Sequence, residues 1–87
     1  MAKKESLKWK IAVDHFDERW GHCIEWLESW SEPNDKQGWW SMGSVWGGDE
    51  KAKVFNTKAD AEKVLALFAK CGYNMDDFWV QGCLIKE

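Results

Sequence analysis

The residues best suited to chemistry lie between positions 14 and 23, where histidine, cysteine and carboxylate side chains are close in the sequence. The run 14–18 reads DHFDE and is followed by His22 and Cys23. Zinc ligands on a helix should be three or four residues apart, whereas His15 and His22 are seven apart and the adjacent His22 and Cys23 point in different directions. We interpret the carboxylates as residues of a helix N-terminus, favoured by its dipole, and expect no metal and no cofactor.

Nucleophilic catalysis has no better support. Each of the three cysteines, Cys23, Cys71 and Cys83, falls on an apolar stripe or in an expected strand, where a thiol is a small buried hydrophobe and its thiolate is disfavoured. The sequence has no nucleophile elbow and no Walker pattern, and the glycines of 43–48 lack the strand-to-helix context of a phosphate loop. We therefore expect that the protein is not an enzyme.

Tryptophan is the strongest signal in the sequence. The 87 residues include eight tryptophans, three of them in the stretch GWWSMGSVWGG at 38–48. Adjacent side chains in a strand face opposite ways, so at most one of Trp39 and Trp40 can lie beneath a layer of helices, and the same holds for Phe78 and Trp79. Part of this aromatic surface must therefore lie outside the main core, either exposed or packed as a minor core.

The clearest element is a helix over residues 58–71. Thr57 is a suitable N-cap with Asp60 three residues later, and Gly72 follows the last turn. Apolar residues recur at steps of three and four and predict one buried stripe: Ala61, Val64, Leu65, Phe68 and Cys71.

Three other segments predict strands. Residues 7–14 (LKWKIAVD) alternate between two faces, while 51–56 (KAKVFN) and 77–85 (DFWVQGCLI) are rich in β-branched and aromatic residues. The Gly47-Gly48 pair suits a tight turn, so we expect residues 39–46 to pair antiparallel with 51–55.

Residues 17–33 (DERWGHCIEWLESWSEP) support two interpretations. Helical spacing relates Trp20, Cys23, Ile24, Leu27 and Trp30, with Asp14 or Asp17 as a cap and Pro33 after the end. Strand-like alternation relates Trp20, His22, Ile24 and Trp26, and Gly21 weakens a helix. The helix, which we favour, gives the ferredoxin-like order β-α-β-β-α-β, and the strand gives a β-meander with one helix and a final strand.

Both interpretations predict the same fold class, an α+β two-layer sandwich in which a four-stranded antiparallel sheet carries helices on one face. We expect one domain spanning residues 1–87, with residues 1–6 disordered. Three cysteines cannot all pair within one chain, which favours a reducing, cytoplasmic location. No run of about 18 apolar residues is present, so we expect no membrane contact.

The expected sheet defines a candidate binding surface. If the residues at 9, 11, 13, 78, 80 and 84 face the helices, Trp79 lies on the uncovered face with Lys8, Lys10 and Lys53. Together with the hairpin over 39–55, this predicts a binding site formed by Trp39, Trp40, Trp46, Trp79, Lys8, Lys10 and Lys53.

Surplus tryptophan without a catalytic motif predicts a non-catalytic protein-binding module. We expect the partner to be another protein, or a second copy of the chain in a homodimer; small adaptors and inhibitors, including virus-encoded ones, have this size. The alternative is a platform for single-stranded nucleic acid, on which aromatic rings stack bases and lysines contact phosphates. The net charge of −3 argues against this alternative. A third hypothesis is a carbohydrate or small apolar ligand stacked on tryptophan.

Overall fold

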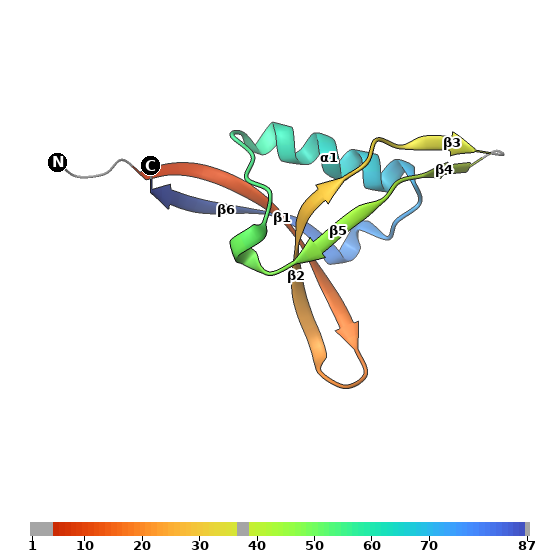
Figure 1. Cartoon of the computed structure of the whole chain (residues 1–87), viewed down its shortest axis with the longest axis horizontal. Coiled ribbons are helices and arrows are strands. Elements are labelled where there is room, and N and C mark those ends of the chain that lie inside the picture. Colours follow the sequence, from red (N-terminus) through yellow and green to blue (C-terminus); the bar gives the residue numbers. More distant parts are fainter. Residues whose placement is uncertain (1–4, 37–38, 87) are drawn as a thin grey trace.

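An antiparallel sheet crossed by one helix forms the body of the protein (Figure 1). The computed structural model describes residues 5–36 and 39–86, without the side chains of Lys36 and Trp39. The main sheet has the strand order β5-β2-β1-β6, with β1 at Glu5–Asp17, β2 at Gly21–Trp30, β5 at Ser44–Gly47 and β6 at Phe78–Lys86. A second, two-stranded sheet pairs β3 (Asn34–Lys36) with β4 (Trp39–Ser41). The helix is α1 (Lys58–Lys70), and short 3-10 turns occur at η1 (Asp49–Lys51) and η2 (Met75–Asp77).

The α+β class and the four-stranded antiparallel sheet are confirmed, but the ferredoxin-like order is wrong. Residues 21–30 form a strand and not a helix, because their alternating side chains suit a strand in the middle of a sheet, paired with β1 on one edge and β5 on the other. The observed order, strands followed by one helix and a final strand, agrees better with the meander alternative.

The expected hairpin between 39–46 and 51–55 is also wrong. Gly48 has a φ of −73° and leads into η1 and not into a tight turn. Strand β5 pairs with β2, and β4 pairs with β3. Residues 51–56 form no strand beyond a single bridge between Phe55 and Trp9.

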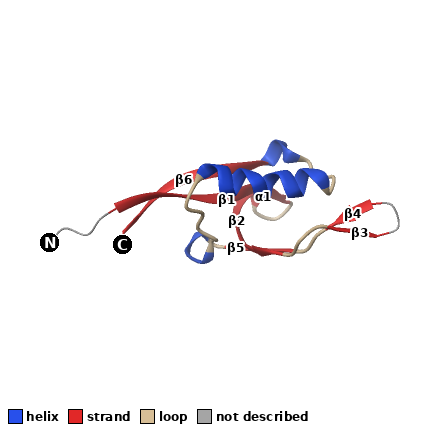
Figure 2. Cartoon of the chain, turned by 90° about the horizontal axis from the view of Figure 1, so that it is seen from above, coloured by secondary structure: helices blue, strands red, loops and turns tan. Residues whose placement is uncertain are grey.

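Helix α1 agrees closely with the sequence pattern. The Thr57 side chain accepts a hydrogen bond from the Asp60 amide at 3.1 Å, and Gly72 has a φ of 87° after the last turn. The buried residues of the helix are Ala61, Val64 and Phe68. They pack on Ile11 and Leu27, which are fully buried and belong to β1 and β2, so α1 covers one face of the sheet (Figure 2).

The sheet splits between its two central strands. Strand β1 pairs with β6 along 5–13 but with β2 only along 12–17. Strand β2 has an irregularity between Leu27 and Ser29, and from Trp26 onward it pairs with β5. Such a bulge bends a strand away from its neighbour, so the N-terminal half of β1 and the C-terminal half of β2 diverge.

Residues 52–55 occupy this split. The Lys53 amide donates to the Leu27 carbonyl at 2.8 Å, and Trp9 and Phe55 exchange two backbone hydrogen bonds of 3.0 and 2.8 Å. The Phe55 side chain is 7% exposed, and its ring stacks on Trp30 with centroids 5.7 Å apart. The segment therefore satisfies backbone groups that the diverging strands cannot pair with each other.

A buried ammonium group holds η1 beside the split. Lys10 follows the core face residue Trp9 and precedes Ile11, so its side chain lies on the face opposite α1. Its Nζ donates to the Asp49 carboxylate at 2.8 Å and to the Asp49 carbonyl at 3.3 Å. The Lys10 side chain is 11% exposed and that of Asp49 is 62% exposed, so only the lysine is buried.

The ends of the described chain are ordered by strand pairing. Glu5 and Ser6, which were expected to be disordered, pair with Lys86 and Ile85. Residues 1–4, for which disorder was also expected, lie outside the described part. No helix within 5–36 or 39–86 has the length and apolar character needed to cross a membrane.

The unequal burial of the ion pair predicts unequal effects of removing its two members. Asp49→Ala leaves a buried ammonium without its carboxylate and should lower the free energy of unfolding by about 1–2 kcal/mol, less than for a fully buried pair because Asp49 is largely in water. Lys10→Met keeps the volume of the stem and should change it by less than about 1 kcal/mol. Urea denaturation measures the free energy of unfolding of both variants. A larger decrease for Lys10→Met than for Asp49→Ala would contradict this account.

Candidate protein-binding surface

The far end of the β1–β2 hairpin projects from the body of the protein (Figure 1). The pairing of β6 with β1 ends at Val13, and the pairing of β5 with β2 begins at Trp26. Residues 14–24 therefore pair only with one another, and we call this segment the hairpin arm. A two-stranded hairpin by itself is marginally stable in water, so the arm depends on its turn and on cross-strand contacts.

The turn of the arm is fixed by Asp17 and Gly21. The Asp17 carboxylate accepts hydrogen bonds from the amides of Arg19 and Trp20, at 2.7 and 3.2 Å. Gly21 has a φ of 76°, a conformation that glycine adopts at little cost. Asp17 is thus a turn residue, and the expected helix N-terminus around 14–18 does not exist because both Asp14 and Asp17 lie in β1.

One face of the arm carries two exposed apolar side chains. The pairs Phe16↔His22 and Asp14↔Ile24 share this face, because they follow the pair Ala12↔Trp26 at intervals of two residues. Phe16 is 61% exposed and Ile24 is 56% exposed, and neither is covered by α1. Trp20, in the turn at the tip, is 79% exposed, although the helical pattern predicted that it is buried.

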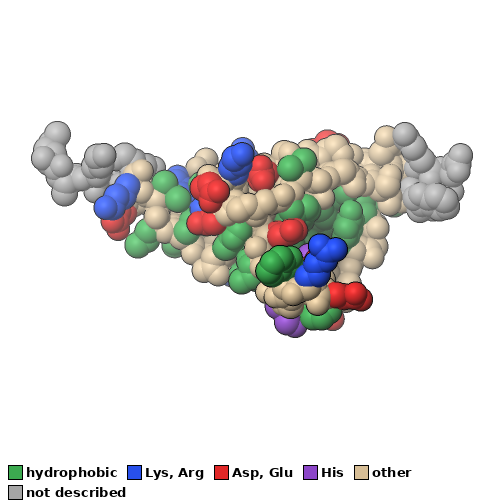
Figure 3. Space-filling view, turned by 60° about the horizontal axis from the view of Figure 1, so that its bottom comes forward, with side chains coloured by type: hydrophobic (Ala, Val, Ile, Leu, Met, Phe, Trp, Pro, Cys, Tyr) green, Lys and Arg blue, Asp and Glu red, His purple; other side chains and the backbone are tan. Residues whose placement is uncertain are grey.

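Polar groups lie within and around this face. The Phe16 and His22 rings meet edge to face with centroids 5.3 Å apart, and His22 Nδ1 lies 3.1 Å from the Asp14 carboxylate. Figure 3 shows hydrophobic side chains on the projecting hairpin, next to basic, acidic and histidine side chains, and others along the body. The face is therefore mixed: the two apolar side chains alternate with Asp14 and His22, and protein–protein interfaces commonly combine apolar and polar groups in this way.

The open face continues onto the body as a small second core. Ala12 lies between Trp26 and Trp79 across the strands and is fully buried, although it lies on the side away from α1. Both indoles are partly buried, and the Trp79 Nε1–H donates to the Gln81 side-chain oxygen at 3.2 Å. Trp79 thus lies on the open face as expected, and it packs there as part of this second core.

The three predicted lysines have separate environments. Lys8 lies on the open face and its Nζ donates to the Asn56 side chain at 3.0 Å. Lys10 lies on the same face but is buried and paired with Asp49. Lys53 is exposed beside the split. They do not form the common basic surface that the sequence suggested.

The tryptophans of 39–46 also separate. Trp46 packs against the main core, with its ring centroid 5.7 Å from those of both Phe68 and Phe78. Trp40 is 38% exposed, and Lys70 Nζ lies 3.9 Å from its ring centroid. The side chain of Trp39 lies outside the described part. The structure therefore does not bring the predicted residues of 39–46 together with Trp79.

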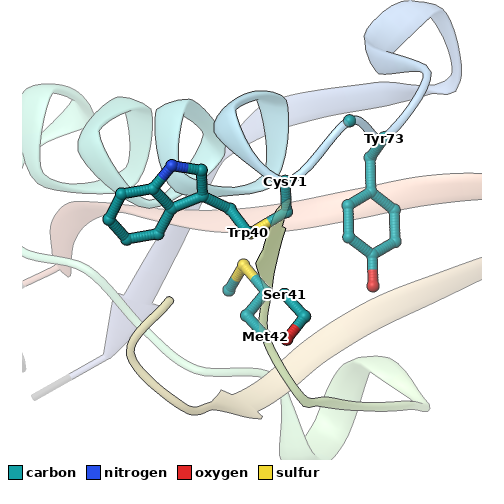
Figure 4. Close-up of a pocket in the computed structure, with 6 residues that line it drawn as sticks. Trp40, Ser41, Met42, Cys71 and Tyr73 are labelled. Carbon is teal, nitrogen blue, oxygen red and sulfur yellow. The ribbon is translucent and has the colours of Figure 1, made fainter. Parts of the chain in front are cut away.

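A shallow hollow of about 230 Å³ lies between β4 and the end of α1. Trp40 and Tyr73 stand on either side of Cys71 in this hollow, with Met42 nearby (Figure 4). The lining is mainly aromatic and sulfur-containing. Across residues 5–36 and 39–86, no group of three or more His, Cys, Asp and Glu side chains is placed to hold a metal ion.

No protein-family model, no curated protein and no solved structure matches the chain.

The hairpin arm was missed because residues 17–33 support a helical pattern equally well. Two features of the sequence could have indicated it. One is the alternation of Trp20, His22, Ile24 and Trp26, and the other is Gly21 placed four residues after Asp17. An Asx turn followed by a residue with positive φ is a hairpin feature and is uncommon inside a helix.

Replacement of Gly21 should loosen the arm without affecting packing. No atom lies within 4 Å of a Cβ added to Gly21, so Gly21→Ala introduces backbone strain alone, of about 1 kcal/mol. Amide hydrogen exchange within residues 14–24 should accelerate about fivefold. Gly48→Ala is the control, since Gly48 has a negative φ and the atoms nearest to an added Cβ belong to the flexible Glu50 side chain. Equal acceleration in both variants would argue against a strained turn.

Proposed function

We propose that this protein is a non-catalytic protein-binding module and that the face of the hairpin arm that carries Phe16 and Ile24 is its contact surface. The observation that carries the proposal is that Phe16 and Ile24 share one exposed face beside Trp20 at the tip. Contiguous exposed apolar surface on a small protein usually marks a site of interaction. Aromatic residues contribute strongly to binding energy in such sites.

The form of the arm supports the same proposal. Its two strands pair only with each other, so its amides open more readily than those of the four-stranded body. A partner that packs on the Phe16 and Ile24 side chains would remove them from water and stabilise the hairpin. Binding and ordering of the arm are therefore coupled, as expected for a recognition element on a rigid body.

Binding of single-stranded nucleic acid has weaker support. Stacking of bases needs exposed rings beside free cationic groups. Lys10 is paired with Asp49, and the arm carries Asp14, Asp17 and Glu18 together with Arg19. This local charge would repel phosphates, whereas it is compatible with the rim of a protein interface.

Polar replacement of the exposed arm residues should weaken partner binding and preserve the fold. Phe16→Ser and Ile24→Ser should each weaken binding by about tenfold or more, equivalent to about 1.4 kcal/mol of lost apolar contact. The measurement is affinity capture followed by mass spectrometry, and then titration calorimetry with the purified partner. Leu7→Ser is the matched control, because Leu7 is 54% exposed but lies at the other end of β1.

Two results would contradict the proposal. One is recovery of the same proteins, at the same affinity, by the natural chain and by both arm variants. The other is tight binding of a fluorescent single-stranded oligonucleotide that weakens steeply as salt rises, which is the signature of phosphate neutralisation. That second result would favour the nucleic-acid alternative.

A further inference from the structure

The outer edge of β6 is a long strand edge without the usual protection against pairing. In the part of the chain that the structure describes, β6 is a terminal strand of the sheet and no segment pairs with its outer edge (Figure 1). Its pairing with β1 runs without a register shift from Phe78 to Lys86. The other terminal strand, β5, has only four residues.

The sequence of β6 makes this edge unusual. Residues 78–85 (FWVQGCLI) contain no charged residue and no proline. Natural edge strands are normally kept from pairing by a lysine, a proline, a bulge or a covering loop. The outer edge therefore offers backbone groups along a regular apolar strand, which is the requirement for adding another strand. One of them, the Gly82 carbonyl, already accepts a hydrogen bond from Gln81 Nε2 at 3.1 Å.

We propose that the chain forms a two-fold symmetric dimer in which the β6 edges of two copies pair antiparallel and join their sheets. The charges at the two ends of β6 favour a second copy of the chain as the partner and favour antiparallel pairing. Asp76 and Asp77 precede the strand and Lys86 ends it. Antiparallel pairing sets the acidic turn of each copy near Lys86 of the other, whereas parallel pairing would set Lys86 beside Lys86 and the acidic turns together. Within each copy, Glu5 of β1 lies opposite Lys86.

Symmetry and charge together fix the register. An antiparallel pair about a two-fold axis has one residue opposite its own copy, and side chains that pair across the axis share a face of the sheet. Centring the pair on Gln81 sets Phe78 opposite the partner's Leu84, and it brings η2, which carries Asp76, near the partner's Lys86 at the end of its β6. Leu84 is 65% exposed in the single chain, so this register covers an apolar side chain that α1 leaves in water.

The interface is distinct from the hairpin arm. Phe16 and Ile24 lie in the segment where β1 no longer pairs with β6. The dimer would carry two arms on one continuous eight-stranded sheet, which doubles the number of contact surfaces available to a partner. The inference therefore stands whether or not the arm binds another protein.

A single cysteine at the axis tests the register directly. We would prepare Gln81→Cys with Cys23, Cys71 and Cys83 replaced by serine. The opposed residues at the axis form a non-hydrogen-bonded pair, in which the Cβ atoms are about 4.5 Å apart and within reach of a disulfide, so mild oxidation should convert most of the protein into a covalent dimer. The matched control keeps Cys83 as the sole cysteine. Its two copies would lie about 13 Å apart and should not cross-link.

Light scattering on the reduced natural chain tests the dimer itself. The expected mass is twice the 10.2 kDa of one chain. Gln81→Lys, at an exposed position, sets two ammonium groups together at the axis and should give the mass of one chain. Lys86→Glu should weaken the dimer, and Asp76→Lys combined with Lys86→Glu should restore it.

Three results would overturn the inference. These are the mass of one chain for the natural protein up to about 100 μM, cross-linking of the Cys83-only control as fast as the Gln81→Cys variant, and a dimer that survives Gln81→Lys. Phe16→Ser and Ile24→Ser should leave the dimer intact. A dimer lost only in those two variants would place self-association on the arm and not on β6.

Discussion

The structure depends on how the chain closes the split between β1 and β2. Two neighbouring strands that diverge leave backbone donors and acceptors unpaired near the core, a cost that folded proteins rarely carry. Here residues 52–55 enter the split, with Phe55 beneath Trp30 and with backbone bonds to Trp9 and Leu27. The Lys10–Asp49 pair holds the preceding turn against the opposite face. Because of the split, β2 pairs with β1 in the arm and with β5 in the body. The exposed arm and the covered core are therefore formed by the same pair of strands.

The tryptophans are divided by the pleat of the strands. Trp9, Trp30 and Trp46 pack against the core beneath α1, where aromatic rings supply much of the buried surface that a chain of this size needs. Trp26 and Trp79 lie on the other face and enclose Ala12 between them. A residue as small as alanine at that position allows the two indoles to approach across the strand. Tryptophan content therefore reflects two packing layers on a thin sheet, and the exposed apolar surface is made by other positions as well, chiefly Phe16 and Ile24.

The parts of the fold that the sequence predicted are those with local, redundant signals. Helix α1 has an N-cap at Thr57, a terminating Gly72 and a regular apolar stripe, and the final strand is rich in β-branched and aromatic residues. The residues at 17–33 have two valid periodicities, and only pairing with β1 and β5 selects one of them. Likewise, the Gly47-Gly48 pair permits a turn but does not require it, because glycine also adopts ordinary negative φ values. Which of the candidate site residues lie together could not be predicted for the same reason: whether Trp46 or Phe16 is exposed depends on which strands become neighbours, a long-range property that no short stretch of sequence encodes.

Glu5 pairs with Lys86, so the first and last described residues lie side by side at one pole of the sheet (Figure 1). The hairpin tip at 18–20 lies beyond the opposite end of β1. A tag or a fused domain joined at either end would thus emerge away from the arm and leave it accessible. Because Glu5 and Lys86 are close, a short linker could join them and new termini could be placed in another loop. In such a circularly permuted form the order of the strands along the chain would change, while their order in the sheet would stay the same.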